Sequence, residues 1–266
     1  MGVITISRGS YSKGREIAEK LAANLGYECI SRDILLEASE HFNIPEIKLI
    51  RAAHDPPSIL DRFKHGKKKY INYIREAFLE HIQKDNVVYH GLVGHFFLQG
   101  IPNIFKVRII ANMKERIQEE MARDDIGEKE ARHILARDDE EKRKWGMYLY
   151  GIDAKDSQLY DLVLQIGNMQ VEDAVDILAQ IAQRPCFRTT PESRSMIRDN
   201  CIAAKSQRIL SQKFPLANVE CKNGSVVVNL ETSLSLEKEV KEEVTKALGD
   251  LDGIKEIRVN AVPFET

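Results

Sequence analysis

Strand-like and helix-like segments alternate through the first two thirds of the chain. Short runs with β-branched or aliphatic residues are typical of buried strands, and they fall at 3–6, 27–30, 87–89, 107–111 and 162–164. Apolar residues at helical spacing predict helices at 17–25, 33–42, 69–84, 113–123, 128–149 and 171–183, with short helices in 45–63. This alternation predicts an α/β fold in which a parallel sheet is flanked by helices.

The order of elements changes near residue 184. Proline, threonine and serine gather between 184 and 194, which is typical of a linker. Asn223-Gly224 favours a tight turn between two short strands. We expect a large domain at 1–185, a linker at 186–196, and a smaller α+β domain of αββαβ order at 197–266. Its elements are a helix containing Ile197 and Ile202, strands at 217–221 and 225–230, a helix at 236–248, and a strand at 254–262.

The composition is that of a globular protein, with 43% hydrophobic and 30% charged residues and a formal net charge of −2. This balance gives no global attraction to nucleic acid, and no apolar stretch approaches the ~20 residues that span a bilayer. The four cysteines lie far apart without metal-ligand or redox spacing, and no targeting segment precedes the first strand. We therefore expect a cytoplasmic protein with reduced thiols, no membrane span and no nucleic-acid partner.

The turn after the first strand has the features of a phosphate site. In an open parallel sheet, ligands bind beyond the carboxyl ends of the strands, where helix N-termini attract anions. Gly9 and Gly14 permit a tight loop here, and Arg8, Lys13 and Arg15 add positive charge. A Walker A motif would place lysine and then serine or threonine after the second glycine, where this chain has arginine and glutamate. For this loop alone, a strand-to-helix turn without a ligand is the alternative.

Four segments of the first domain form a more specific pattern than the loop alone. They are Ile4-Thr5-Ile6-Ser7-Arg8 through Gly14-Arg15-Glu16-Ile17-Ala18; Ser31-Arg32-Asp33-Ile34-Leu35; Asn86-Val87-Val88-Tyr89-His90-Gly91; and Arg137-Asp138-Asp139 with Arg143, Gly151-Ile152-Asp153 and Tyr160-Asp161-Leu162-Val163-Leu164. In this order, across about residues 1–183, they resemble the cytidylate-kinase-like branch of the nucleoside monophosphate kinases.

The resemblance implies a P-loop-kinase-like fold with a phosphate loop, an acceptor flap and a mobile lid that carries arginines. ATP and Mg²⁺ would be used, and catalysis would be mostly positioning and charge neutralisation on the transferred phosphoryl group. For the lid stretch, a surface helix held by ion pairs is the alternative. Carried over, the catalytic residues would be Lys13, Arg15, Arg137 and Arg143; the donor-phosphate contacts Ser7, Arg8, Ser12 and Gly14; and the substrate contacts Asp33, Gly91, Asp138 and Asp139. No protein ligand to a metal is assigned.

Two stretches depart from the family pattern. Tyr11 and Lys13 stand where glycines are usual, and Lys13 is a candidate for the ammonium that the loop otherwise lacks. Leu92 replaces the arginine that usually follows the glycine after the third strand, and its side chain cannot contact an acceptor phosphate by charge. The identity of the acceptor and the catalytic competence of the loop therefore stay open.

Histidines and aromatic residues near these motifs are interpreted as packing residues. His90 and His95 flank the turn after the third strand, and Trp145, Tyr148 and Tyr150 lie at the end of the lid-like helix. Such residues are more often structural than catalytic.

The C-terminal segment carries a second resemblance. Asn223-Gly224 precedes an apolar strand, and Gly253-Ile254 precedes Ile257-Arg258-Val259-Asn260. With the αββαβ order, these features resemble a BON domain over about residues 197–264. The resemblance implies attachment to a membrane or another macromolecule, and here we expect a regulatory role, or an oligomer or protein partner held through this domain.

Three functional hypotheses remain. The first is an enzyme that transfers a phosphoryl group from ATP to a nucleoside monophosphate or a related small acceptor. The second is a catalytically impaired nucleotide sensor that acts through the BON-like domain, motivated by the displaced lysine and by Glu16. A purely structural interaction protein is the third, and it would leave the order of loop and lid motifs to chance.

Overall fold

The computed structural model describes residues 2–9, 13–31, 65–91, 94–233 and 236–262. The helices expected at 33–42 and 45–63 lie outside these residues, as do Ser12 and Asp33. The chain divides into two compact units, the first formed from 1–35 and 84–190 and the second from 36–83 and 191–266.

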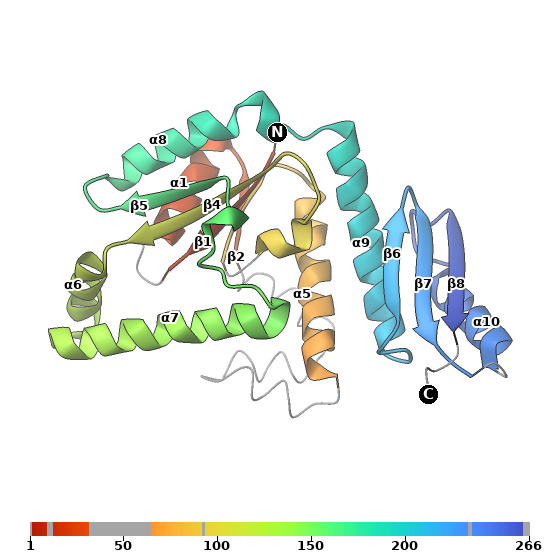
Figure 1. Ribbon diagram of the computed structural model, residues 1–266. Helices are drawn as coiled ribbons and strands as arrows, with labels where there is room; N and C mark the ends of the chain where they lie inside the picture. The colour runs from red at the N-terminus through yellow and green to blue at the C-terminus, as the bar shows by residue number, and fades with distance from the viewer. Residues whose placement is uncertain (1, 10–12, 32–64, 92–93, 234–235, 263–266) are drawn as a thin grey trace. The chain divides into compact units, whose positions relative to one another are not determined.

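A five-stranded parallel sheet forms the first unit (Figure 1). Its order is β2-β3-β1-β4-β5, so that the first strand lies in the middle between the third and the fourth. The expected parallel sheet is confirmed. The strands are β1 (Val3–Arg8), β2 (Glu28–Ser31), β3 (Val87–His90), β4 (Ile104–Ala111) and β5 (Leu162–Ile166).

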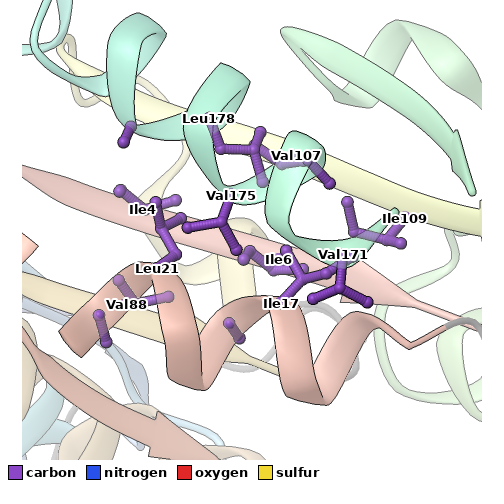
Figure 2. Packing of buried hydrophobic residues seen from close by; sticks show 14 of the residues in the cluster. Ile4, Ile6, Ile17, Leu21, Val88, Val107, Ile109, Val171, Val175 and Leu178 are labelled. Carbon is purple, nitrogen blue, oxygen red and sulfur yellow. The ribbon is translucent and has the colours of Figure 1, made fainter. Parts of the chain in front are cut away.

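Helices α1 (Gly14–Leu25) and α8 (Val171–Ala182) build the main core against this sheet. Figure 2 shows Leu21 of α1 and Leu178 of α8 pointing toward β-branched residues of the central strands, and both leucines are fully buried. Gly26 ends α1 with a φ of 67°, a left-handed conformation that glycine adopts at little cost.

Two helices follow β4 and lead to β5. Helix α6 (Met113–Asp124) and helix α7 (Glu128–Tyr150) pack through a small apolar cluster centred on Ile117 and Leu135. Trp145 near the end of α7 is buried, and the ring of Tyr150 contacts the rings of Phe96 and Phe97. Both phenylalanines belong to the short 3₁₀ helix η1 (Gly94–Leu98). Trp145 and Tyr150 therefore pack among other residues, as interpreted from the sequence.

The second unit contains a three-stranded sheet of order β6-β7-β8. β6 and β7 form an antiparallel hairpin, and β7 pairs with β8 in parallel. The Asp199 carboxylate accepts hydrogen bonds from the backbone N–H groups of Asn223 (2.7 Å) and Gly224 (3.0 Å), which fixes the expected tight turn. The αββαβ order is confirmed. Its elements are α9 (Pro191–Ser211), β6 (Asn218–Lys222), β7 (Ser225–Glu231), α10 (Glu237–Leu248) and β8 (Glu256–Val262).

Helix α5 (Gly66–Ile82) groups with α9, although in sequence it lies between β2 and β3. The buried Glu76 of α5 forms an ion pair with Arg208 of α9. A second pair joins Glu80 to Lys205 at 2.8 Å. Helix α9 begins at Pro191, inside the segment expected as a linker, because proline is well tolerated in the first turn of a helix.

No helix among the described residues is long and apolar enough to cross a lipid bilayer. The four cysteines, all of them in the described part of the chain, are free thiols.

The core packing predicts a large loss of stability when Leu21 is shortened. Leu21→Ala should lower the free energy of unfolding by about 2–5 kcal/mol, because it leaves a cavity in a fully buried cluster. Val163→Ala on β5, where the valine is 38% exposed, should cost less than about 1 kcal/mol. Urea unfolding followed by the fluorescence of Trp145, the single tryptophan, measures both. Equal losses in the two variants would contradict the assigned core.

Candidate functional site

A pocket of about 100 Å³ opens at the carboxyl ends of β1 and β4. The chain leaves β1 toward β2 at one edge of the sheet, and it leaves β4 toward β5 at the opposite edge. Diverging connections of this kind leave a crevice in which parallel sheets bind ligands. Ser7 and Arg108 lie opposite each other in the register of β1 and β4, and both line the pocket.

Basic side chains dominate the pocket. Six of the described residues that line it carry positive charge, against two carboxylates, so the pocket attracts anions. These residues come from β1, β4, α6, α7 and the segment that follows α7. The basic residues are Arg8, Arg108, Arg116, Lys142, Arg143 and Lys155, and the carboxylates are Asp139 and Asp153.

An ion pair between Arg116 of α6 and Asp139 of α7 fixes one wall of the pocket. The guanidinium donates one hydrogen bond to each carboxylate oxygen, both at 2.8 Å. This two-point geometry is stronger and more directional than a single contact. On the next turn of α7, Arg143 donates to Glu140 at 2.8 and 2.7 Å, and the contact lowers the pKa of Glu140.

Tyr160 supports Arg108. The Arg108 guanidinium lies 5.7 Å from the centre of the tyrosine ring, and the Tyr160 hydroxyl donates a hydrogen bond to the Ala154 carbonyl at 2.8 Å. Burial raises the pKa of Tyr160. The ring of His95 contacts the Tyr160 ring at 5.0 Å between centroids.

His95 is a neutral packing residue. It is 5% exposed, and within the described residues its Nε2 atom has no hydrogen-bond partner. Burial, with smaller contributions from Lys106 and Arg108, lowers its pKa to about 4. The imidazole is therefore uncharged near pH 7 and does not add to the cations of the pocket.

Four of the residues assigned from the sequence meet at this pocket. Ser7, Arg8, Asp139 and Arg143 all line it. Arg137 does not line it; its side chain is 58% exposed and lies 3.8 Å from carboxylate oxygens of Asp138 and Glu141.

Lys13 and Arg15 do not line this pocket. The Lys13 ammonium lies 3.6 Å from Glu119 of α6, and Lys13 lines a second pocket of about 320 Å³ between α6 and the end of β5. Arg15 donates to Glu19 at 2.8 Å on the outer face of α1. Lys13 has a φ of 56° and directly precedes α1, whose first residue, Gly14, is buried.

The remaining assigned residues lie elsewhere or are not described. Gly91 follows β3, and its N–H donates to the Ile6 carbonyl at 3.1 Å. Asp138 is next to Arg137 and does not line the pocket. Ser12 and Asp33 lie outside the described residues.

Sequence reasoning missed several residues of the pocket. Arg108 carried a usable signal, since it is a charged residue within the expected apolar strand 107–111, whose carboxyl end faces the pocket. Asp153 belongs to the segment Gly151-Ile152-Asp153, and Lys142 is one position before Arg143, but the sequence pattern assigns no role to either residue. Arg116 and Lys155 carried no local signal, because only the folding of α6 and α7 brings them to the strand ends.

The lowered pKa of His95 predicts a loss of stability in acid. An unfolded histidine binds its proton near pH 6.5 and the folded one only near pH 4, so stability falls as pH drops through this window. Between pH 7.5 and pH 5 the loss from His95 should be about 2 kcal/mol. His95→Phe should remove it, so urea unfolding at the two pH values should show a smaller difference for the variant. If the wild-type protein and His95→Phe lost the same unfolding free energy between the two pH values, the buried neutral state of His95 would be refuted.

Comparisons with known proteins match the N-terminal part of the chain. Residues 3–168 match the cytidylate kinase-like family. The cytidylate kinase of Sulfolobus acidocaldarius is 25% identical over 182 residues, which cover 68% of this chain and 94% of that protein. The cytidylate kinase of Staphylothermus marinus is 27% identical over 190 residues, covering 69% and 98%.

The fold is also found in a solved structure. An uncharacterized protein from Eubacterium ventriosum superposes with a TM-score of 0.52 at 22% identity, covering 67% of this chain and 96% of that one. The family match spans more than half of the chain. The chain belongs to the cytidylate kinase-like family.

Proposed function

We propose that this protein transfers a phosphoryl group from ATP to a nucleoside monophosphate or a related small acceptor. The observation that carries the proposal is the gathering of six basic side chains at the carboxyl ends of β1 and β4. Phosphoryl transfer needs such a cluster, because charge on the phosphate oxygens must be neutralised while donor and acceptor are held in line. Family membership supports the same reaction class.

In this proposal the described residues bind and orient phosphate groups. Arg8, Arg108 and Arg143 contact phosphate oxygens, and Ser7 contributes a hydroxyl beside them. The ion pair with Asp139 holds Arg116 in place at the pocket wall and offsets its charge. Lys13, Arg15 and Gly14 remain candidates for contacts with the donor at the start of α1, and Arg137 remains a candidate from the exposed face of α7.

The pocket suits Mg²⁺ that arrives bound to phosphate. Mg²⁺ usually keeps several waters and binds through one or two carboxylates together with substrate phosphates. Asp153 supplies a carboxylate at the pocket, whereas both oxygens of Asp139 already accept hydrogen bonds from Arg116, and the surrounding cations favour the anionic complex over a bare ion. The metal would neutralise charge on the donor phosphates.

A catalytically impaired nucleotide sensor is the second candidate. Lys13 pairs with Glu119 and Arg15 pairs with Glu19. These carboxylates would compete with a donor phosphate for the two cations, which favours the sensor. A sensor would bind ATP or ADP without turnover, whereas the enzyme would form ADP at the expense of ATP.

We further propose that the αββαβ module is BON-like and regulatory. The support is the packing of α5 against α9 through the Glu76–Arg208 and Glu80–Lys205 pairs. The chain of α5 continues directly into β3 of the sheet that carries the pocket, so a partner bound to the module would act on that strand through a covalent connection. An oligomer or protein partner would be held through the same module.

Turnover tests the proposed function. The protein with ATP, Mg²⁺ and a panel of nucleoside monophosphates should form ADP and the matching diphosphate. Arg143→Ala should lower kcat/KM by about 100-fold, because it removes a charged phosphate contact. Arg132→Ala is the matched control: Arg132 also lies on α7 and pairs with a glutamate of its own helix, but it does not line the pocket. ATP binding without turnover would favour the sensor, and absence of nucleotide binding would exclude both.

A further inference from the structure

A polyphosphate donor needs a compact ammonium beside its terminal phosphates. In P-loop enzymes a lysine after the second loop glycine supplies it, and in this chain that position is Arg15. The Arg15 side chain is 70% exposed and is held by Glu19 on the outer face of α1. A planar guanidinium also does not reproduce the point charge of an ammonium.

Lys13 is the nearest lysine in sequence, but its geometry points elsewhere. Its ammonium lies 3.6 Å from the carboxylate of Glu119. The pocket that it lines also contains Glu115, so the acidic side chains there oppose a polyphosphate.

Lys142 has the required chemistry at the required place. It lies on α7, one turn after Asp139, and it lines the basic pocket with Arg8 and Arg108 from the strand ends. Its side chain is half-buried, so a bound phosphate would compete with less water there than at an exposed lysine.

We propose that Lys142, carried by α7, supplies the ammonium that binds the terminal phosphates of the donor, in place of the lysine of the phosphate loop. This inference rests on the proposed function for the identity of the donor, but it concerns binding of a polyphosphate and is tested separately from turnover.

The electrostatic setting of Lys142 supports this role. Burial lowers its pKa, and Arg8 of β1 and Arg116 of α6 act in the same direction, while Asp138 and Asp139 of its own helix oppose them. An entering polyphosphate would reverse this balance and favour the charged amine. The other charged groups of the pocket are Arg108, Arg143, Asp153 and Lys155.

The test compares lysines by calorimetry with tripolyphosphate, ATP and AMP as probes. Lys142→Met should weaken binding of tripolyphosphate and ATP at least tenfold and that of AMP less than threefold, because AMP lacks the terminal phosphates. Lys144→Met is the matched control on the exposed face of the same helix and should change each affinity less than threefold. Lys13→Met should have a smaller effect than Lys142→Met. Near-UV circular dichroism and the unfolding midpoint establish that each variant is folded.

A pH series separates a charge role from a packing role. As pH rises from 7 to 9.5, the wild-type protein should lose tripolyphosphate affinity more steeply than Lys142→Arg, because arginine keeps its charge and the lysine does not. The ligand titrates identically in both measurements, so the difference reports the side chain. Equal slopes would overturn the proposal.

The outcomes distinguish this inference from the proposed function. Tripolyphosphate binding that depends on Lys142, without turnover, would uphold the inference and refute the enzyme. Turnover with unchanged ATP affinity in Lys142→Met would refute the inference and uphold the enzyme. The inference would also be overturned if Lys13→Met lost more tripolyphosphate affinity than Lys142→Met. Absence of tripolyphosphate and ATP binding by the wild-type protein would overturn it as well.

Discussion

Mutual repulsion among clustered cations is the constraint on which the candidate site depends. Basic side chains from two strands, two helices and one connecting segment converge on a volume of about 100 Å³, where like charges repel one another. The bidentate pair of Arg116 and Asp139 partly offsets this repulsion and fixes α6 against α7. An anion that entered the pocket would offset the remaining positive charge. The fold therefore creates a positive electrostatic potential at the pocket in the absence of a ligand, and such a potential favours anions.

The sheet topology explains why this potential lies where it does. β1 occupies the centre of the sheet, and its outgoing connection diverges from that of β4. Residues at the carboxyl ends of these two strands therefore lie beside a crevice. The apolar layer of α1 and α8 keeps the strands rigid beneath it, so the charged residues at the edge are positioned by a core that has no polar function of its own.

Much of the fold, and less of the site, could be predicted from the sequence. Periodicity located all five strands of the parallel sheet and the αββαβ order, because both patterns follow from which face of each element is buried. The site depends on side-chain direction, which periodicity does not encode. Thus Arg8 and Arg143 could be found through motifs, whereas Arg116 reaches the pocket only because α6 and α7 pack as a pair. The grouping of α5 with α9 could not be predicted from the sequence either, since the ion pairs between the two helices join residues 132 and 125 positions apart.

The pairing of α5 with α9 has a consequence for how the molecule can be divided. The chain passes between the two compact units at residues 35–36, 83–84 and 190–191. A fragment that stops after residue 190 would keep α5 but lose Arg208, leaving the Glu76 carboxylate with no counter-charge from α9. The C-terminal module therefore stabilises α5, which lies in the crossover between β2 and β3. Removing the module would destabilise this helix in the chain that remains.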